Sequence, residues 1–240
     1  MKVEVIGAHG HVVHCSLVIG QWQWGREGES PVASFVMCAR LRAEMFYWWD
    51  ILGTFIFCVS GALAGRQLKM DYLGLFVMAL VTGTGGGVLR SVLLGDVPPV
   101  IFTTPDYVIV AVLSVPTAVL FDRWWHRYHR LVSVVDALGI GLFACVGARA
   151  ASEHGLAWWA CMGMGMMTAT FGGVIRDIIR NEVPLIFRKE IYATAALLGA
   201  GLMLYLDSLG VGSSVSVVIS ALVAAAVRLL AIRYALNARE

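Results

Sequence analysis

The sequence predicts an all-α membrane protein with seven transmembrane helices, arranged as two inverted three-helix repeats plus a C-terminal helix. Three observations support this fold class. Hydrophobic residues make up 59% of the 240-residue chain and charged residues only 14%, whereas a soluble domain carries about 25% charged residues. Apolar runs of membrane-spanning length follow one another closely. The chain also resembles itself at one fixed offset.

The first 44 residues differ from the rest of the chain. They mix charged, aromatic and histidine residues without a sustained period, so we expect a disordered N-terminal tail. An alternative is that the natural start is Met45 and that the tail is not native. Potential metal ligands in this segment are His9, His11, His14 and Cys15. Because no second ligand pair accompanies them at a defined spacing, no metal site is predicted.

From Trp48 onward the chain is a series of apolar runs joined by short charged loops. Each run approaches the ~20 residues that a helix needs to cross a hydrocarbon core. The predicted spans are residues 48–65, 71–91, 105–122, 134–151, 156–178, 190–206 and 212–234. The predicted units are a tail (1–44), a first three-helix repeat (45–130), a second three-helix repeat (131–207), and the seventh helix with a C-terminal tail (208–240).

Basic residues gather in loops that would face one side of the membrane. This side holds Arg66, Lys69, Arg123, Arg127, Arg130, Arg176, Arg180, Arg188, Lys189, Arg228, Arg233 and Arg239. Because Lys and Arg mark the cytoplasmic side, we expect the N-terminus outside, the C-terminus in the cytoplasm, and the inner (plasma) membrane as the location. Arg40 and Arg42, just before the first span, oppose this orientation.

The internal repeat has an offset of 86 residues. The segment Asp-Ile-Leu-Gly at 50–53 matches Asp-Ala-Leu-Gly at 136–139, and Gly-Gly-Val-Leu-Arg at 86–90 matches Gly-Gly-Val-Ile-Arg at 172–176. Each copy contains three predicted spans, an odd number, so the second copy must enter the membrane from the opposite side. Such inverted repeats place equivalent groups symmetrically about the membrane midplane, which suits a pathway open to both sides.

The second span of each repeat carries the candidate site, which comprises Gly85, Gly86, Gly87 and Arg90 in the first copy and Gly172, Gly173, Arg176 and Asp177 in the second. Adjacent glycines permit a kink or a short unwound turn. The carbonyl groups that unwinding frees can replace part of a cation's hydration shell. The alternative is close helix packing, for which Gly83 and Gly87 have the usual spacing of four.

The two arginines also allow two interpretations. An arginine inside a membrane is costly unless it faces water or a partner, or extends to the interface. Arg90 and Arg176 are therefore either pore-lining charges or residues that reach the headgroups at a helix end. Asp177 is either a local counter-charge or a group that attracts cations. Asp50 and Asp136 are interpreted as caps at the start of the first helix of each repeat.

Other classes of function lack support. No nucleophile–base pair, metal set or phosphate-binding loop appears at a defined spacing, so neither an enzyme nor a cofactor is predicted. No basic face indicates a nucleic-acid partner. The loop at 123–130 mixes aromatic and basic residues, which indicates an interfacial belt that can contact membrane lipid.

These motifs resemble the bacterial relatives of the trimeric intracellular cation (TRIC) channels. The resemblance rests on the segments 50–62, 85–90 and 96–99 and on their degenerate second copy, and it covers about residues 47–234. It implies a homotrimer with one pore in each subunit, permeable to monovalent cations, chiefly potassium. The glycine-kinked second and fifth helices would line this pore, which makes the eight candidate residues above pore residues.

The same bacterial family is also labelled a glycine transporter. A secondary transporter of glycine or another small zwitterionic solute is therefore an alternative, in which Arg176 and Asp177 would supply the matching charges. A third possibility is a scaffold protein without transport, in which the glycines are buried against neighbouring helices.

Overall fold

The computed structural model describes residues 2–6, 12–16, 31–125, 131–188 and 190–234. Two short strands, β1 (Lys2–Ile6) and β2 (Val12–Ser16), pair antiparallel. The helix α1 (Pro31–Gln67) follows them. The boundary predicted near residue 45 thus falls inside α1. Proline is favoured in the first turn of a helix, which agrees with a start at Pro31.

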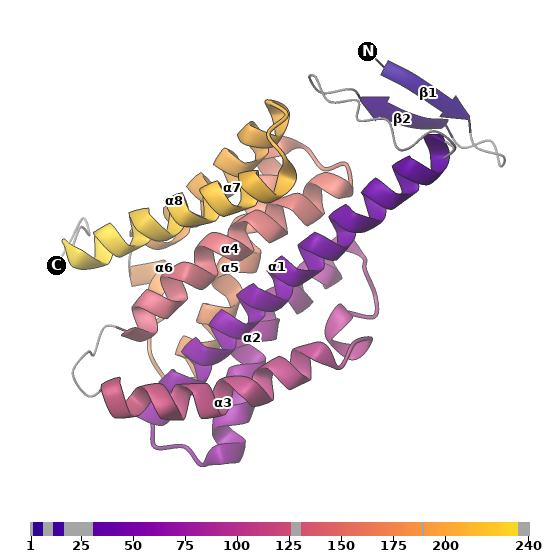
Figure 1. Ribbon diagram of the computed structural model, residues 1–240. Coiled ribbons are helices and arrows are strands. Elements are labelled where there is room, and N and C mark those ends of the chain that lie inside the picture. Colours follow the sequence, from indigo (N-terminus) through magenta and orange to yellow (C-terminus); the bar gives the residue numbers. More distant parts are fainter. Residues whose placement is uncertain (1, 7–11, 17–30, 126–130, 189, 235–240) are drawn as a thin grey trace.

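Each of the seven predicted spans coincides with a long helix (Figure 1). After α1 these are α2 (Tyr72–Leu94), α3 (Asp106–Trp125), α4 (Leu131–Glu153), α5 (Trp158–Ile179), α7 (Glu190–Ser208) and α8 (Ser213–Arg233). Two short elements precede the third helix of each half: η1 (Val100–Phe102) before α3 and α6 (Leu185–Arg188) before α7.

Five of the described helices are long and apolar enough to cross a membrane: α1 over Met45–Gln67, α2, α4 over Val132–Glu153, α7 over Ile191–Ser208, and α8. The helix α3 contributes a shorter apolar stretch, Asp106–Leu120. The helix α5 is outside this set because its glycines, threonines and tryptophans lower its mean hydropathy. Within its described residues, the protein is therefore an all-helical membrane protein apart from the N-terminal strand pair.

The ends of α2 show how the sequence sets helix boundaries. A side-chain oxygen of Asp71 accepts a hydrogen bond from the backbone N–H of Gly74 at 2.7 Å, which caps the N-terminus. Gly95 ends the helix with a positive φ of 83°, a left-handed conformation that favours glycine.

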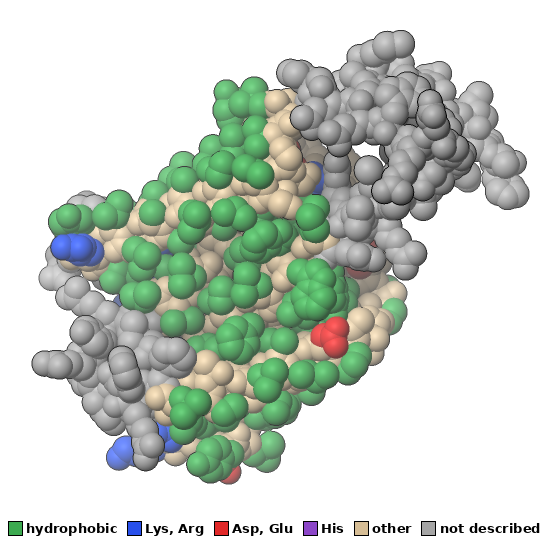
Figure 2. Space-filling view, viewed as in Figure 1, with side chains coloured by type: hydrophobic (Ala, Val, Ile, Leu, Met, Phe, Trp, Pro, Cys, Tyr) green, Lys and Arg blue, Asp and Glu red, His purple; other side chains and the backbone are tan. Residues whose placement is uncertain are grey.

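The two predicted repeats pack through α1 and α4, which lie against one another. The helix α1 also packs on α2 and α3, and α4 on α5, α7 and α8 (Figure 1). At the centre, the rings of Phe57 and Phe143 lie 5.1 Å apart. Figure 2 shows hydrophobic side chains covering the middle of one face of the bundle, with the few charged side chains near its margins. This surface suits a lipid environment.

The contact between α1 and α4 is reciprocal. A Cβ atom built on Gly53 would lie 2.5 Å from the ring of Phe143, and one built on Gly139 would lie 2.9 Å from the ring of Phe57. Gly139 and Phe143 are the repeat equivalents of Gly53 and Phe57. Gly53 of the first half contacts Phe143 of the second, and Gly139 of the second half contacts Phe57 of the first. Such reciprocal contacts are those of two units related by a two-fold axis.

Candidate functional site

The two glycine-rich segments meet where α2 crosses α5. A Cβ atom on Gly86 would lie 2.1 Å from the carbonyl oxygen of Thr168, and one on Gly172 would lie 2.2 Å from that of Thr82. This contact is again reciprocal, because Thr168 and Gly172 are the repeat equivalents of Thr82 and Gly86. No residue larger than glycine fits at either position without moving the backbone. The crossing is closed by direct backbone contact between the two helices.

The expectation of an unwound turn at these glycines is wrong. Both α2 and α5 are continuous α-helix through the candidate segments. The glycines instead remove side chains so that the helices approach closely, which was the packing alternative. Gly85 faces the side chain of Ile175 on α5. A Cβ on Gly173 would lie 2.4 Å from the hydroxyl of Tyr192.

Gly87 differs from the other candidate glycines because it faces open space. The nearest neighbouring atom to a Cβ built there is Nη2 of Arg90, at 4.0 Å. Gly87, Arg90, Asp50 and Tyr107 line a crevice of about 20 Å³. This volume is close to the room that a single water molecule needs.

Arg90 belongs to a group that we call the first-half cluster, consisting of Asp50, Arg90 and Tyr107. Arg90 donates a hydrogen bond to Asp50 at 2.9 Å, and the Tyr107 hydroxyl donates to the other oxygen of Asp50 at 2.6 Å. The arginine side chain is 11% exposed and the carboxylate 9%. Asp50 lies well inside α1 rather than at its start, so it is not a helix cap, and it is the ion-pair partner of Arg90.

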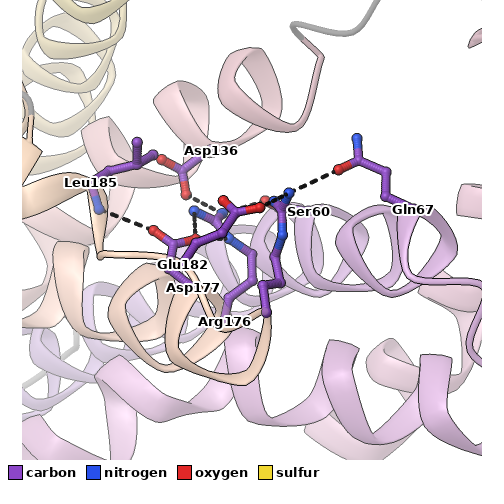
Figure 3. Close-up of polar contacts among 8 residues, drawn as sticks. Ser60, Gln67, Asp136, Arg176, Asp177, Glu182 and Leu185 are labelled. Carbon is purple, nitrogen blue, oxygen red and sulfur yellow. Dashed lines mark hydrogen bonds and ion pairs between the residues drawn. The ribbon is translucent and has the colours of Figure 1, made fainter.

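The second-half cluster consists of Asp136, Arg176, Asp177 and Tyr192. Arg176 donates to Asp136 at 2.6 Å and to the hydroxyl of Ser60 at 2.8 Å (Figure 3). Both ion-pair side chains are buried, at 1% and 0% exposure. Arg176 therefore does not extend to the headgroups, and Asp136, inside α4, is not a helix cap.

Asp177 is the local counter-charge for Arg176. Its Oδ1 accepts a hydrogen bond from Nε of Arg176 at 2.9 Å, and its Oδ2 accepts one from the backbone N–H of Leu185 at 3.1 Å. Asp177 thereby links the end of α5 to the start of α6. The first repeat has Ser91 at the equivalent position, so this carboxylate occurs only in the second half.

The sequence interpretation missed Asp50 and Asp136 as site residues. The signal was present, since each acid precedes its arginine by 40 residues in both copies. Only the packing of the helices shows that these distant residues meet. Ser60 lies ten residues after Asp50 on α1, so the two clusters are about 15 Å apart along that helix. The closed α2–α5 crossing lies between them.

Some earlier expectations fall outside the described part of the chain. The loop at 126–130 and the histidines at 9 and 11 are not described, nor are the side chains of His14 and Cys15. Among the described residues, no three His, Cys, Asp or Glu side chains form a possible metal site.

An apolar helical bundle with buried Asp–Arg pairs on inward helix faces defines a polytopic membrane protein with a polar interior. The family model described as glycine transporter matches twice, over residues 47–123 and 133–208. A membrane protein of Deinococcus radiodurans is 39% identical over 161 residues, 66% of this chain and 75% of that protein. The inner membrane protein YadS of Escherichia coli is 36% identical, covering 65% and 75%.

Solved structures agree with these relatives. The TRIC trimeric intracellular cation channel orthologue from Rhodobacter sphaeroides has a TM-score of 0.75 and 34% identity, covering 80% of this chain and 99% of that one. A prokaryotic TRIC channel crystallised in 0.5 M KCl has a TM-score of 0.75 and 30% identity, covering 81% and 99%. The chain belongs to the TRIC channel family, whose family model carries the description glycine transporter.

Proposed function

We propose that the protein is an inner-membrane channel for monovalent cations, chiefly potassium, with a path in each subunit along α2 and α5. The observation that carries this proposal is the α2–α5 crossing at Gly86 and Gly172, with a buried ion-pair cluster on either side. Solved structures of high similarity are cation channels, which supports the same class of function.

The proposed topology has seven membrane-spanning helices, with α1–α3 and α4–α7 as inverted repeats. Its support is the two reciprocal contacts, together with two matches to one family model whose starts are 86 residues apart. The helices α3 and α5 then cross the membrane as well, and α3 exposes apolar side chains such as Ile109, Val112 and Leu113 that lipid would cover. The excess of basic loop residues supports an external N-terminus and a cytoplasmic C-terminus.

Ion passage requires α2 and α5 to separate, because their backbones touch at Gly86 and Gly172. Separation would expose the carbonyl oxygens of Thr82 and Thr168 to the path. The Thr82 hydroxyl is buried and has no hydrogen-bond partner among the described residues, so it is available as a further ligand. Oxygen atoms of this kind replace the hydration shell of a cation.

A homotrimer is the proposed assembly. Its support is the trimeric state named for the Rhodobacter sphaeroides channel, which matches 80% of this chain. The described helices also expose many large apolar side chains, among them Leu73, Val77 and Leu222, which lipid or another subunit would cover.

The description of the family model favours a second candidate, a carrier of glycine or a similar zwitterion. Such a site needs one positive and one negative group that are free to bind the solute. Arg176 and Asp177 were the predicted pair, but they bind each other, Asp136, Ser60 and Leu185. A zwitterion would have to displace these buried contacts, so the geometry supports the channel better.

The test is flux through purified protein in liposomes, with a potassium gradient and, separately, a glycine gradient. We expect potassium conductance that changes in Arg90→Ala and in Arg176→Ala but not in Arg188→Ala, since Arg188 is exposed. Saturable glycine uptake without potassium conductance would replace the channel by the carrier. Silence in both assays would support a scaffold.

A further inference from the structure

A second arginine reaches the second-half cluster from outside the repeats. Arg228 lies on α8, which begins after the second family match ends at residue 208. Its side chain is buried, at 3% exposure, and its guanidinium lies 4.9 Å from the ring centre of Tyr192. Tyr192 in turn lies beside the ion pair, since a Cβ atom built on Gly173 would lie 2.4 Å from its hydroxyl and 3.5 Å from both Nη2 of Arg176 and Oδ1 of Asp136. The helix α8 has no counterpart in the first repeat, because it lies outside both family matches.

Arg228 is incompletely satisfied where it lies. Its Nε atom has no hydrogen-bond partner among the described residues, nor does the Tyr192 hydroxyl or Oδ2 of Asp136. In the first half, by contrast, the Tyr107 hydroxyl binds Oδ2 of Asp50. A buried arginine without a complete set of hydrogen bonds is costly, so packing alone does not account for it.

The charges of the second-half cluster explain why Arg228 is present there. Relative to the first half, the second half has gained one carboxylate, Asp177, where the first has Ser91. Arg176 pairs with two carboxylates, Asp136 at 2.6 Å and Asp177 at 2.9 Å, and so balances only one of the two negative charges. Arg180 and Glu182 form their own ion pair at 2.8 Å. Without Arg228 the cluster would keep one uncompensated negative charge. Asp177 and Arg228 are thus two additions to the second-half cluster, and their charges have opposite signs.

We propose that Arg228 is a tethered cation that balances Asp177 and so limits how strongly this end of the path attracts permeating cations. This inference rests on the proposed channel function. A fixed charge in a low-dielectric interior acts over longer distances than an exposed one, because water and salt screen it less. The helix outside the repeats thereby sets the cation affinity of one end of an otherwise symmetrical path.

Four proteins test the balance: wild type, Arg228→Gln, Asp177→Asn and the double variant. In planar bilayers at low salt, Arg228→Gln should raise the potassium-over-chloride permeability ratio and the unitary conductance by about twofold or more. Asp177→Asn should lower both. The double variant, which is again balanced, should return toward wild type, a recovery that loss of packing would not produce. Arg228→Lys keeps the charge and should resemble wild type, as should Arg188→Gln.

Thermal unfolding of the same proteins in detergent provides a readout that does not need conduction. Each single variant should unfold at a lower temperature, and the double variant should recover part of the loss. Wild-type selectivity in Arg228→Gln, or a double variant that is worse than both singles, would overturn the inference. Absence of potassium conductance in wild type would contradict the proposed function, while the unfolding cycle would still test the charge balance.

Discussion

Asp136 and Arg176 form a completely buried ion pair at 2.6 Å, whereas their repeat equivalents Asp50 and Arg90 form one at 2.9 Å beside a water-sized crevice. The same two residue types, 40 residues apart in each copy, therefore differ in their access to water. Breaking a buried pair leaves an uncompensated charge, and water reduces that cost where it can enter.

This difference predicts unequal losses of stability. Asp136→Asn should lower the free energy of unfolding by about 3–5 kcal/mol, because Asp177 alone would then face the two buried positive charges of Arg176 and Arg228. Asp50→Asn should cost less, since water in the crevice can solvate Arg90. Thermal unfolding of both variants in the same detergent checks the order. Equal losses would show that the crevice is not hydrated.

The α2–α5 crossing predicts a contrast between neighbouring glycines. Gly86→Ala would place a methyl group against the carbonyl oxygen of Thr168, at an overpacking cost of about 1–3 kcal/mol. Gly87→Ala has open space and gains helix propensity, so it should be neutral or stabilising. Unfolding temperatures of the two variants measure this contrast. A tolerated Gly86→Ala would mean that the helices do not touch there.

The reciprocal contact of α1 and α4 predicts a rescue that works in both directions. Gly53→Ala should lower the unfolding temperature because its methyl group meets the ring of Phe143, and Phe143→Leu in the same protein should recover part of the loss. Gly139→Ala should likewise be rescued by Phe57→Leu. Recovery in the swapped pairings, such as Gly53→Ala with Phe57→Leu, would contradict the assigned contacts.

His154 predicts a pH dependence at the loop that follows α4. Nδ1 faces the carbonyl oxygen of Ala150 at 2.9 Å and Nε2 faces Asp96 at 3.1 Å, so both nitrogens donate only when the ring is protonated. The hydrogen bond to Ala150, and next the one to Asp96, raise the pKa of His154 above its usual 6.5. A raised pKa in the folded protein stabilises it below the unfolded pKa, and this contribution is lost as the pH rises through the folded value.

We therefore expect the unfolding temperature to fall slightly between about pH 6 and about pH 8. The effect should stay below about 1 kcal/mol, because the pair is exposed. His154→Gln should remove this part of the pH profile and leave the rest. A His154→Gln profile identical to that of wild type would show that the contact with Asp96 does not form in solution.

The positions of the helices were predictable because membrane spans leave a strong local signal. All seven predicted spans coincide with helices, and their boundaries differ by only a few residues except at the start of α1. That start was missed because residues 31–44 lack the apolar character of a span, although a helix can continue beyond the hydrocarbon core. The internal repeat was predictable for the same reason, since similar residues at one fixed offset can be recognised in the sequence alone.

The roles of the site residues were less predictable. Gly86 and Gly172 were identified as candidate site residues, but a pair of adjacent glycines fits both an unwound turn and a close helix crossing. Asp177 was identified as a possible counter-charge, and its contact with Arg176 is local along the chain. Asp50 and Asp136 were misinterpreted as caps, because their partners lie 40 residues away and on another helix.

Hydropathy and the residue pattern alone predicted that the chain lies in lipid, the order of its helices, the internal repeat and the family to which it belongs. These properties follow from hydropathy and from matching residues, which are local or periodic. The packing of the helices was needed to show that the glycines close the α2–α5 crossing, that Arg90 and Arg176 each pair with an aspartate from another helix, and that Arg228 joins the second-half cluster. These outcomes depend on which helix faces meet, and a one-dimensional pattern does not contain that information.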